Sequence, residues 1–318
     1  MINEHVGGGA ALPRVAVLMA TFNGVRWVDE QIDSILDQRG VSVRLFISDD
    51  GSTDGTAEHL VARSASDSRI CLLDRRSGPP GVAANFLYLF SKSRVDSSEF
   101  VALSDQDDVW QPWKLAEQVS LIVSENADAV SSNVTSFDRK GYRGLIVKSK
   151  PQRRWDFVFE AAGPGSTYVF APAMYTRLIT ALEEVETSDV AVHDWLFYAL
   201  VRALSGNWII DRRSTVYYRQ HDRNVLGQHS GREAFFLRFS RLRSGFYRRQ
   251  FLLIARISLQ VGESCHDHEW ACDLRDLVRE LEGRDLFSRL SIWRRRHEIR
   301  RDRWEGVELA GACLLGFW

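Results

Sequence analysis

The sequence predicts an α/β protein in which a mostly parallel sheet is flanked by helices and followed by a helical C-terminal extension. Over roughly the first 135 residues, short continuous apolar runs alternate with helix-spaced apolar patterns. Such alternation is typical of strands covered on both faces and joined by helices. Several apolar runs end directly in acidic or small polar residues, and beyond about residue 230 the chain becomes arginine-rich helix.

The length and composition are those of a folded protein with one large domain, or one domain and an appendage. The chain has 318 residues and 45% are hydrophobic, enough for a sizeable core. A net charge of −1 argues against nucleic acid as a partner. The N-terminus lacks a signal-peptide pattern, and no apolar stretch reaches the ~18 residues of a spanning helix. We therefore expect a cytoplasmic protein.

The cysteines favour the same compartment. Cys71, Cys265, Cys272 and Cys313 are few and scattered. Two of them lie near histidines, but the spacing C-H-x-H-x3-C matches no common structural zinc site. Free thiols in a reducing compartment are the preferred interpretation.

Strands and helices are expected in turn through the first part of the chain. The expected strands are Val15–Ala20, Val43–Ser48, Ile70–Asp74, Phe100–Asp105 and Asp128–Val134. The helices expected between them lie near residues 28–36, 57–61, 81–93 and 111–125. Ser52 or Thr53 is expected to cap the second of these helices, and Pro112 suits the first turn of the fourth.

The middle section is less regular. We expect a strand within residues 166–172, a helix from Pro172 to about Glu184, and a second helix that opens at His193 and Asp194. Residues 207–221 have the composition of a strand.

Acidic and small polar residues gather where the predicted strands end. The strand ends are Thr21–Asn23, Asp49–Asp50, Asp74–Arg76 and Asp105–Asp108. In parallel sheets ligands bind at the carboxyl ends of strands. We therefore expect these four segments to surround one ligand site.

The last of these segments, "SDQDDVW", carries three acids in four residues between apolar neighbours. Like charges this close repel, and they persist where a cation or hydrogen-bond donors satisfy them. Oxygen ligands at strand ends suit Mg²⁺ or Mn²⁺, which neutralise phosphates. A solvated turn is the simpler alternative. "DQDDV" also fits the D-x-D-x-[TV] pattern of aspartate-nucleophile phosphatases, but it follows the fourth strand instead of the first.

Three segments together carry a resemblance to a known family. "VAVLMATFNG", "FISDDGSTDGT" and "ALSDQDDVWQPWKL" resemble the family 2 glycosyltransferases with the GT-A fold. "SDQDDVW" with the later "HDW" and "YRQHDRNVLG" is most similar to bacterial rhamnosyltransferase-like members. The resemblance covers about residues 13–228. The loop "RRSGPPG" departs from the family, whose members commonly have an Asn-x-Gly turn there.

The resemblance implies a role for each matching residue. The nucleotide-sugar would be contacted by Thr21, Asn23, Asp49, Asp50, Arg75, Arg76, Asp105 and Gln106. The metal, Mg²⁺ or Mn²⁺, would be held by Asp107, with Asp105 and His221 beside it; Asp108 would be a further ligand or a supporting acid. Asp194 occupies the position of the catalytic base.

The resemblance also implies the reaction and its partners. The donor would be a nucleoside-diphosphate sugar, dTDP-rhamnose as the best guess or a UDP-sugar. The acceptor would be a glycan or lipid-linked glycan of a bacterial surface polysaccharide. A cation stabilises the leaving diphosphate, while a carboxylate takes the proton of the attacking hydroxyl. One displacement inverts the anomeric carbon.

Simpler interpretations stay open for several residues. Asp194 could merely cap its helix, His221 could be a surface or core histidine, and Trp110 could serve packing. The segment Gly163–Thr167 could line an acceptor pocket because glycines allow close backbone approach. For the whole protein, the alternatives are an aspartate-based, Mg-dependent phosphotransferase and a non-catalytic scaffold that binds nucleotide-sugars.

We expect two regions along the chain. Residues 1–229 would form the catalytic domain, with a nucleotide-binding half at about 13–135 and an acceptor half at about 136–229. Residues 230–318 would form the helical, arginine-rich region.

The start of that region has an amphipathic pattern. No acid occurs between Glu233 and Glu263, and the arginines and the apolar residues recur on different helical faces. Such a helix can lie on the anionic inner face of the cytoplasmic membrane. Alternatively it packs on the catalytic domain with its arginines in solvent.

Overall fold

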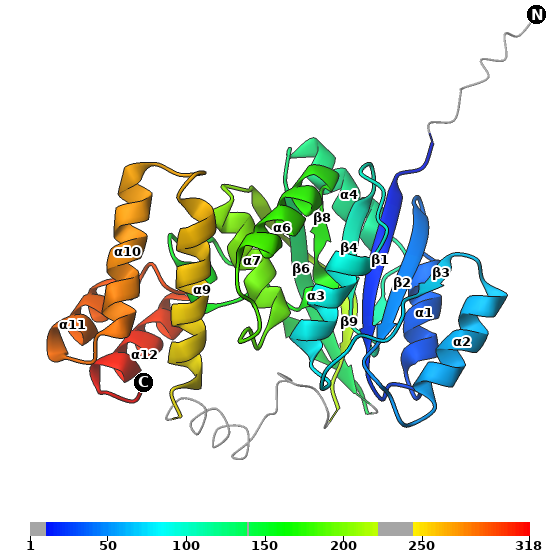
Figure 1. Cartoon of the computed structure of the whole chain (residues 1–318), viewed down its shortest axis with the longest axis horizontal. Coiled ribbons are helices and arrows are strands. Elements are labelled where there is room, and N and C mark those ends of the chain that lie inside the picture. The colour runs from blue at the N-terminus through cyan, green and yellow to red at the C-terminus, as the bar shows by residue number, and fades with distance from the viewer. Residues whose placement is uncertain (1–10, 139, 222–243) are drawn as a thin grey trace, which may run out of the picture.

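The computed structural model describes residues 11–138, 140–221 and 244–318, which form a layered α/β structure with a cluster of helices at one end (Figure 1). The strands are β1 (Arg14–Thr21), β2 (Ser42–Asp49), β3 (Ile70–Leu72), β4 (Phe100–Ser104), β5 (Val109–Trp110), β6 (Ala129–Asp138), β7 (Gly141–Ile146), β8 (Val169–Phe170) and β9 (Trp208–Arg219). The helices are α1 (Val28–Leu36), α2 (Thr56–Ser66), α3 (Val82–Lys92), α4 (Lys114–Ser124), α5 (Asp156–Phe159), α6 (Pro172–Glu184), α7 (His193–Ala203), α9 (Phe246–Gly262), α10 (His268–Glu282), α11 (Leu286–Arg294) and α12 (Arg303–Leu314).

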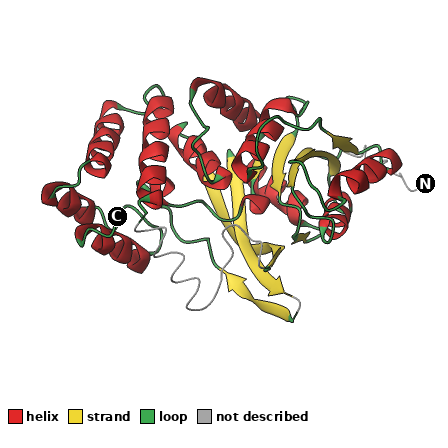
Figure 2. Cartoon of the chain, turned by 60° about the horizontal axis from the view of Figure 1, so that its bottom comes forward, coloured by secondary structure: helices red, strands yellow, loops and turns green. Residues whose placement is uncertain are grey.

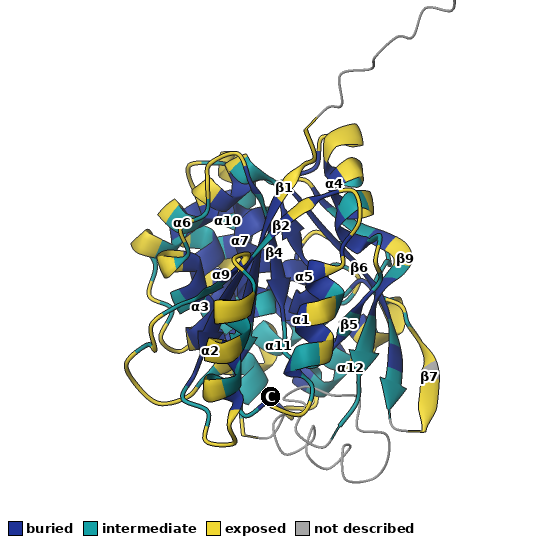
Figure 3. Cartoon of the chain, turned by 90° about the vertical axis from the view of Figure 1, so that its right-hand side faces the viewer, coloured by how far each residue is buried: buried dark blue, intermediate teal, exposed yellow. Residues whose placement is uncertain are grey.

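The sheet is mostly parallel, as predicted. Its strand order is β3-β2-β1-β4-β8-β6-β9-β5, with β7 paired to β6. The pairs β1–β2, β1–β4, β2–β3 and β6–β9 are parallel, whereas β5, β7 and β8 pair antiparallel with their neighbours. The sequence did not reveal β5 or β7: β5 is too short to show periodicity, and β7 lies at an exposed edge (Figure 3).

Each face of the sheet has its own apolar core. Along β1, Val15, Val17 and Met19 face the core formed with α1, α2 and α4. The alternate residues Ala16 and Leu18 face the core formed with α3, α6 and α7. This period-2 alternation within a continuous apolar run is what a strand buried on both faces requires.

Two predicted helix starts are wrong in detail. Helix α2 begins at Thr56 after a left-handed Gly55, and neither Ser52 nor Thr53 caps it. Ser52 instead donates its hydroxyl to the Asp49 carboxylate at 2.5 Å. Pro112 precedes α4, which begins at Lys114, and its carbonyl oxygen accepts a hydrogen bond from the amide of Arg39 at 2.8 Å. The Ser52 hydroxyl and the Pro112 carbonyl therefore hydrogen-bond to neighbouring segments instead of to the helix ends.

The C-terminal helices pack against the sheet-containing part of the chain (Figure 2). Phe251 and Ile254 of α9 belong to the same apolar core as α7. Arg248 donates to the carbonyl oxygens of Leu281 and Gly283, and Arg256 pairs with Glu282 at 2.6 Å. For α9 the packing alternative is therefore the correct one. The preceding part of the predicted basic helix, residues 222–243, lies outside the described residues.

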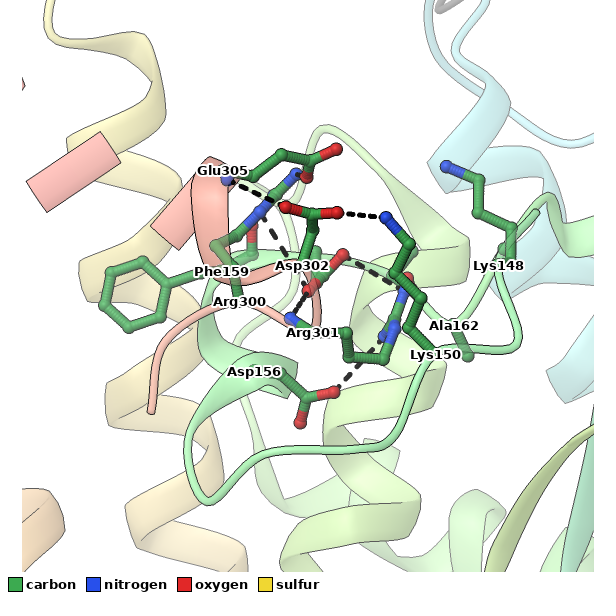
Figure 4. A network of polar contacts seen from close by, with 12 residues as sticks. Lys148, Lys150, Asp156, Phe159, Ala162, Arg300, Arg301, Asp302 and Glu305 are labelled. Atoms are coloured by element: carbon green, nitrogen blue, oxygen red, sulfur yellow. Dashed lines mark hydrogen bonds and ion pairs between the residues drawn. The ribbon is translucent and has the colours of Figure 1, made fainter. Parts of the chain in front are cut away.

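A buried ionic network joins the extension to the middle of the chain (Figure 4). The guanidinium of Arg301, 4% exposed, lies 3.3 Å from the Asp156 carboxylate and 3.1 Å from that of Glu160. Asp156 also accepts a hydrogen bond from the hydroxyl of Tyr198 at 2.9 Å.

None of the helices in the described part of the chain is both long enough and apolar enough to cross a membrane.

Removing the Arg301 charge should destabilise the protein strongly. Arg301→Met removes the buried cation that Asp156 and Glu160 share, which costs up to about 3–5 kcal/mol in free energy of unfolding. Among the described residues, Asp156 then keeps only Arg202 as an ion-pair partner, at 3.1 Å. Lys150→Met is the matched control, because Lys150 pairs with Asp302 nearer the surface and its loss costs about 1 kcal/mol or less. Urea unfolding of both variants measures the difference. Equal midpoints would show that the network does not hold the extension in place.

Candidate active site

A large cavity opens where β1 and β4 end. Its volume is about 1140 Å³, above the roughly 300–1,000 Å³ of most small-molecule sites. The lining includes the strand ends around Thr21 and Asp105, the turn at Gly163–Gly165 with the start of α7, and residues of the C-terminal helices α9 and α12. Of the four segments expected to surround one site, those at Thr21–Asn23, Asp49–Asp50 and Asp105–Asp108 contribute to the lining, whereas Asp74–Arg76 does not.

Asp105 lies at the centre of a group of acids. Burial raises the pKa of its carboxyl well above the usual range, and the charges of Asp107, Asp108 and Asp194 raise it further. These acids come from two distant parts of the sequence, the end of β4 and the start of α7. Without a cation, this concentration of negative charge opposes ionisation.

Asp107 is held in a defined position by the end of β9. Its carboxylate lies 2.7 Å from Nε2 of His221, whose ring stacks on Trp27 at 4.3 Å between centroids. The Nε–H of Arg219 donates to the Asp107 carbonyl oxygen at 2.7 Å. Asp107 and His221 are therefore adjacent, as a shared metal site would require, and both line the cavity.

Asp108 is a buried acid that joins neighbouring segments of the chain. It is fully buried, accepts a hydrogen bond from the Ser166 hydroxyl at 2.7 Å, and accepts another from the Arg219 amide at 3.0 Å. Burial first, and the charge of Asp107 second, raise its pKa to about 8. It does not line the cavity, so it acts as a supporting acid that links the acidic turn to the 163–167 segment.

Gln106 fixes the loop after β1. Its side chain accepts a hydrogen bond from the Phe22 amide at 2.8 Å and donates one to the Phe22 carbonyl oxygen at 2.9 Å. A Cβ atom at Gly24 would lie 2.1 Å from Oε1 of Gln106. Glycine is thus required at position 24 for this approach.

The residues expected to bind nucleotide divide into two groups. Thr21, Asn23, Asp50, Asp105 and Gln106 line the cavity, whereas Asp49, Arg75 and Arg76 do not.

The three residues away from the cavity hold its loops. Asp49 accepts hydrogen bonds from the Gly51 and Ser52 amides and from the Thr21 hydroxyl at 3.0 Å. Arg76 forms an ion pair with Asp50 at 2.7 Å, and the Arg75 guanidinium lies against Gly51, within 2.3 Å of where a Cβ would be. The sequence could not distinguish these supporting residues from the cavity-lining ones, since Asp49 and Asp50 are adjacent in the chain.

Asp194 faces the acids from across the cavity. It lies in the first turn of α7, where Val192 holds the N-cap position. The backbone N–H groups of Trp195 and Gly165 lie close to its carboxylate and favour the ionised form. Among the residues that the structure describes, none hydrogen-bonds to Oδ1, which is buried. Burial raises the pKa of Asp194 to about 6, against the lowering effects of these amides and of the Lys148 charge.

The neighbouring His193 is buried against an aromatic ring. The ring of His193 stacks on Phe86 with 3.8 Å between centroids, and burial lowers its pKa to about 3, so it is neutral. A Cβ at Gly165 would lie 2.7 Å from Nε2 of His193. The segment 163–165 does line the cavity, which the sequence left open. Trp110 is buried and serves packing.

Charged residues of the extension reach the same cavity. Arg300 and Glu305 pair with each other beside Lys148 in the lining, and the Arg300 guanidinium donates to the Phe159 carbonyl oxygen at 3.0 Å. In Figure 4 Lys148 points away from this network, whereas Lys150 points into it towards Asp302. Sequence reasoning missed these contributions because nothing local in "RRDRWEG" indicates which distant element it meets.

Among the described residues, no group of three or more His, Cys, Asp or Glu side chains forms a ready metal cage. Asp107 and His221 are an adjacent carboxylate and imidazole.

Comparison with known proteins identifies the family. The sequence model of "Glycosyl transferase family 2" matches residues 16–185. The chain belongs to glycosyltransferase family 2. It is 34% identical over 240 residues to the dTDP-rhamnosyl transferase RfbG of Shigella flexneri, covering 74% of this chain and 83% of that protein. The resemblance to rhamnosyltransferase-like members of the family is thus confirmed. Membership of this family favours a glycosyltransferase over the alternative of an aspartate-based phosphotransferase.

Solved structures confirm the GT-A fold of this family 2 glycosyltransferase. S. aureus TarS 1-349 in complex with UDP-GlcNAc has a TM-score of 0.55 at 15% identity, over 96% of this chain and 81% of that one. The mannosyltransferase PcManGT from Pyrobaculum calidifontis, in complex with GDP-Man and Mn²⁺, has a TM-score of 0.52 at 17% identity, over 96% and 74%. An inverting reaction is consistent with the family.

The pKa of Asp194 predicts a pH dependence. The base role expected for Asp194 requires an ionised carboxylate, and burial raises the pKa of this carboxyl to about 6. Sugar transfer should therefore fall by about tenfold per pH unit below that value. Lys148→Met removes a charge that favours ionisation and should move this limb to higher pH, whereas Lys150→Met should not. Donor turnover followed across pH measures both; an unchanged limb in Lys148→Met would contradict the assignment.

Proposed function

We propose that this glycosyltransferase transfers rhamnose from dTDP-rhamnose to a glycan or lipid-linked glycan in the synthesis of a bacterial surface polysaccharide. One observation carries the proposal: Asp194, with a buried oxygen available, shares a cavity with Asp105, Asp107 and Asp50. The likeness to RfbG supports rhamnose and dTDP. The reaction would take place at the cytoplasmic side of the membrane.

The donor would lie along the ends of β1, β2 and β4. Asp50, fixed by Arg76 and by the Gly81 amide at 2.5 Å, would accept hydrogen bonds from the base or ribose. Thr21 and Asn23 would approach the nucleotide from the end of β1. Asp49 and Arg75 would act indirectly, by holding the loop that carries Asp50. Asp105 and Gln106 would face the ribose and the diphosphate.

A divalent cation, Mg²⁺ or Mn²⁺, fits the residues present. Mg²⁺ and Mn²⁺ are held by one or two carboxylates together with substrate phosphates, so a cage built only of side chains is not needed. Asp107 and His221 would hold the cation, with Asp105 beside them; its charge would relieve the repulsion that raises the Asp105 pKa. A bound cation stabilises negative charge on a leaving diphosphate.

The chain's own residues would handle the proton. The acceptor hydroxyl oxygen bonds to the anomeric carbon from the Asp194 side while the bond to the diphosphate oxygen breaks on the opposite side. Oδ1 of Asp194 takes the hydroxyl proton, and the electron pair of the broken bond leaves with the diphosphate. A single displacement inverts the anomeric centre without a covalent intermediate.

Nucleotide binding should require both the cation and Asp107. Thermal unfolding with dTDP and Mn²⁺ should show a higher midpoint than with either alone, because the diphosphate completes the coordination. Asp107→Asn should lose this synergy, and Asp49→Asn should lower the midpoint without ligand by loosening the loop. UDP and GDP serve as comparison nucleotides. Stabilisation by dTDP that is independent of Mn²⁺ would contradict the proposed metal.

Asp194→Asn should separate binding from chemistry. The amide keeps the size of the side chain but cannot accept the proton, so transfer should fall by about 10²–10⁴-fold. The dTDP–Mn²⁺ stabilisation should stay unchanged. Turnover is measured as the release of dTDP from dTDP-rhamnose when the sugar is transferred to water or to an acceptor. A wild-type rate of transfer in this variant would show that Asp194 is not the base.

A further inference from the structure

Large apolar side chains are exposed at one end of the C-terminal helices. Leu286 is 61% exposed and Phe287 84% exposed, at the start of α11. Leu315 is 74% and Phe317 40% exposed, just beyond α12. Exposed apolar residues are ordinary when they are isolated, whereas a group of them marks an interaction surface.

These two segments lie side by side, since α11 packs on α12. Gly316, at φ +78°, is so close to α11 that an added Cβ would lie 2.7 Å from Nη1 of Arg289. The Arg289 guanidinium therefore lies against the segment that follows α12 and adds its charge to the same surface. We call the following group the α11–α12 patch: Arg284, Leu286, Phe287, Arg289 and Leu315.

The α11–α12 patch is positively charged. Within the described parts of the chain, neither Arg284 nor Arg289 forms an ion pair with an acid. Burial lowers the pKa of the adjacent Arg248, and the charges of Arg284 and Arg289 lower it further, so the three cations are close together. Of the nearby acids, Glu282 pairs with Arg256. Asp285 caps α11 through the Phe287 and Ser288 amides, and its single negative charge is outweighed by the two arginines.

The α11–α12 patch is connected to the cavity through α12, because Leu309 and Ala312 of α12 line the cavity. In Figure 1 the C-terminus and the end of α10 are at the bottom, as are the carboxyl ends of β1 and β2. Phe246 and Tyr247, at the start of α9, line the cavity. Leu315 of the patch follows the cavity-lining Ala312 by about one helical turn, so a surface that touched Leu315 would lie close to the cavity lining.

We propose that the α11–α12 patch docks the enzyme on an anionic lipid surface. The exposed apolar side chains enter the boundary between headgroups and acyl chains, while Arg284 and Arg289 contact lipid phosphates. The function of this docking rests on the proposed lipid-linked acceptor, because docking would bring that acceptor close to the cavity. The contact surface thus differs from the basic helix that the sequence indicated, because Arg248 and Arg256 of α9 bind protein groups.

Vesicle flotation without donor or acceptor tests the proposal. The full chain should bind vesicles of phosphatidylcholine mixed with phosphatidylglycerol, bind phosphatidylcholine alone weakly, and lose binding in high salt. Phe287→Ser with Leu315→Ser should reduce binding by about tenfold or more. Arg284→Gln and Arg289→Gln should each reduce it by about fivefold, on anionic vesicles only.

Trp304→Ser is the matched control. Trp304 is 77% exposed but lies at the opposite end of α12 from Leu315, so binding should be unchanged. Equal binding by wild type and the Phe287→Ser, Leu315→Ser variant would overturn the proposal. So would a concentration-dependent dimer that this variant abolishes, which would assign the patch to a second copy of the chain. The variants should release dTDP from dTDP-rhamnose at the wild-type rate. This result would separate the docking test from the test of the transfer reaction.

Discussion

The crowding of carboxylates at one cavity is the constraint on which the rest of the site depends. Asp105, Asp107 and Asp108 follow β4, and Asp194 faces them from α7. Burial and mutual repulsion raise the pKa of Asp105, so the ionised cluster is unfavourable without a compensating cation. A divalent cation would offset the carboxylate charges and could contact an anionic diphosphate at the same time.

The surrounding structure holds this cluster rigidly from several directions. Gln106 fixes the loop after β1 through both polar groups of its amide. Asp108 links the acidic turn to Ser166 and to the end of β9. Arg301 ties the C-terminal extension to Asp156 and Glu160, and so places Arg300 and Glu305 at the cavity. The extension is therefore part of the site's wall and shares its apolar core with the sheet.

Much of the fold followed from local patterns, because buried strands and amphipathic helices leave periodic signals in the sequence. The run Val15–Ala20 and the helix Pro172–Glu184 are examples. The site was predictable where strand ends converge, as at Asp105 and Asp107. It was not predictable where tertiary contacts decide a side chain's partner: Asp49 and Asp50 are neighbours, yet one holds a loop and the other lines the cavity. The same applies to Arg300, whose contact with Phe159 joins residues far apart in the sequence.

Electron paramagnetic resonance of Mn²⁺ tests the central claim most directly. In the presence of dTDP, the wild-type chain should bind Mn²⁺ and reduce the signal of the free ion, and Asp107→Asn should bind it much more weakly. Phosphorus resonances of the bound dTDP should broaden when Mn²⁺ is added, because the ion contacts the diphosphate. Equal Mn²⁺ binding by the wild type and Asp107→Asn, or bound dTDP whose phosphorus resonances Mn²⁺ leaves sharp, would contradict the account.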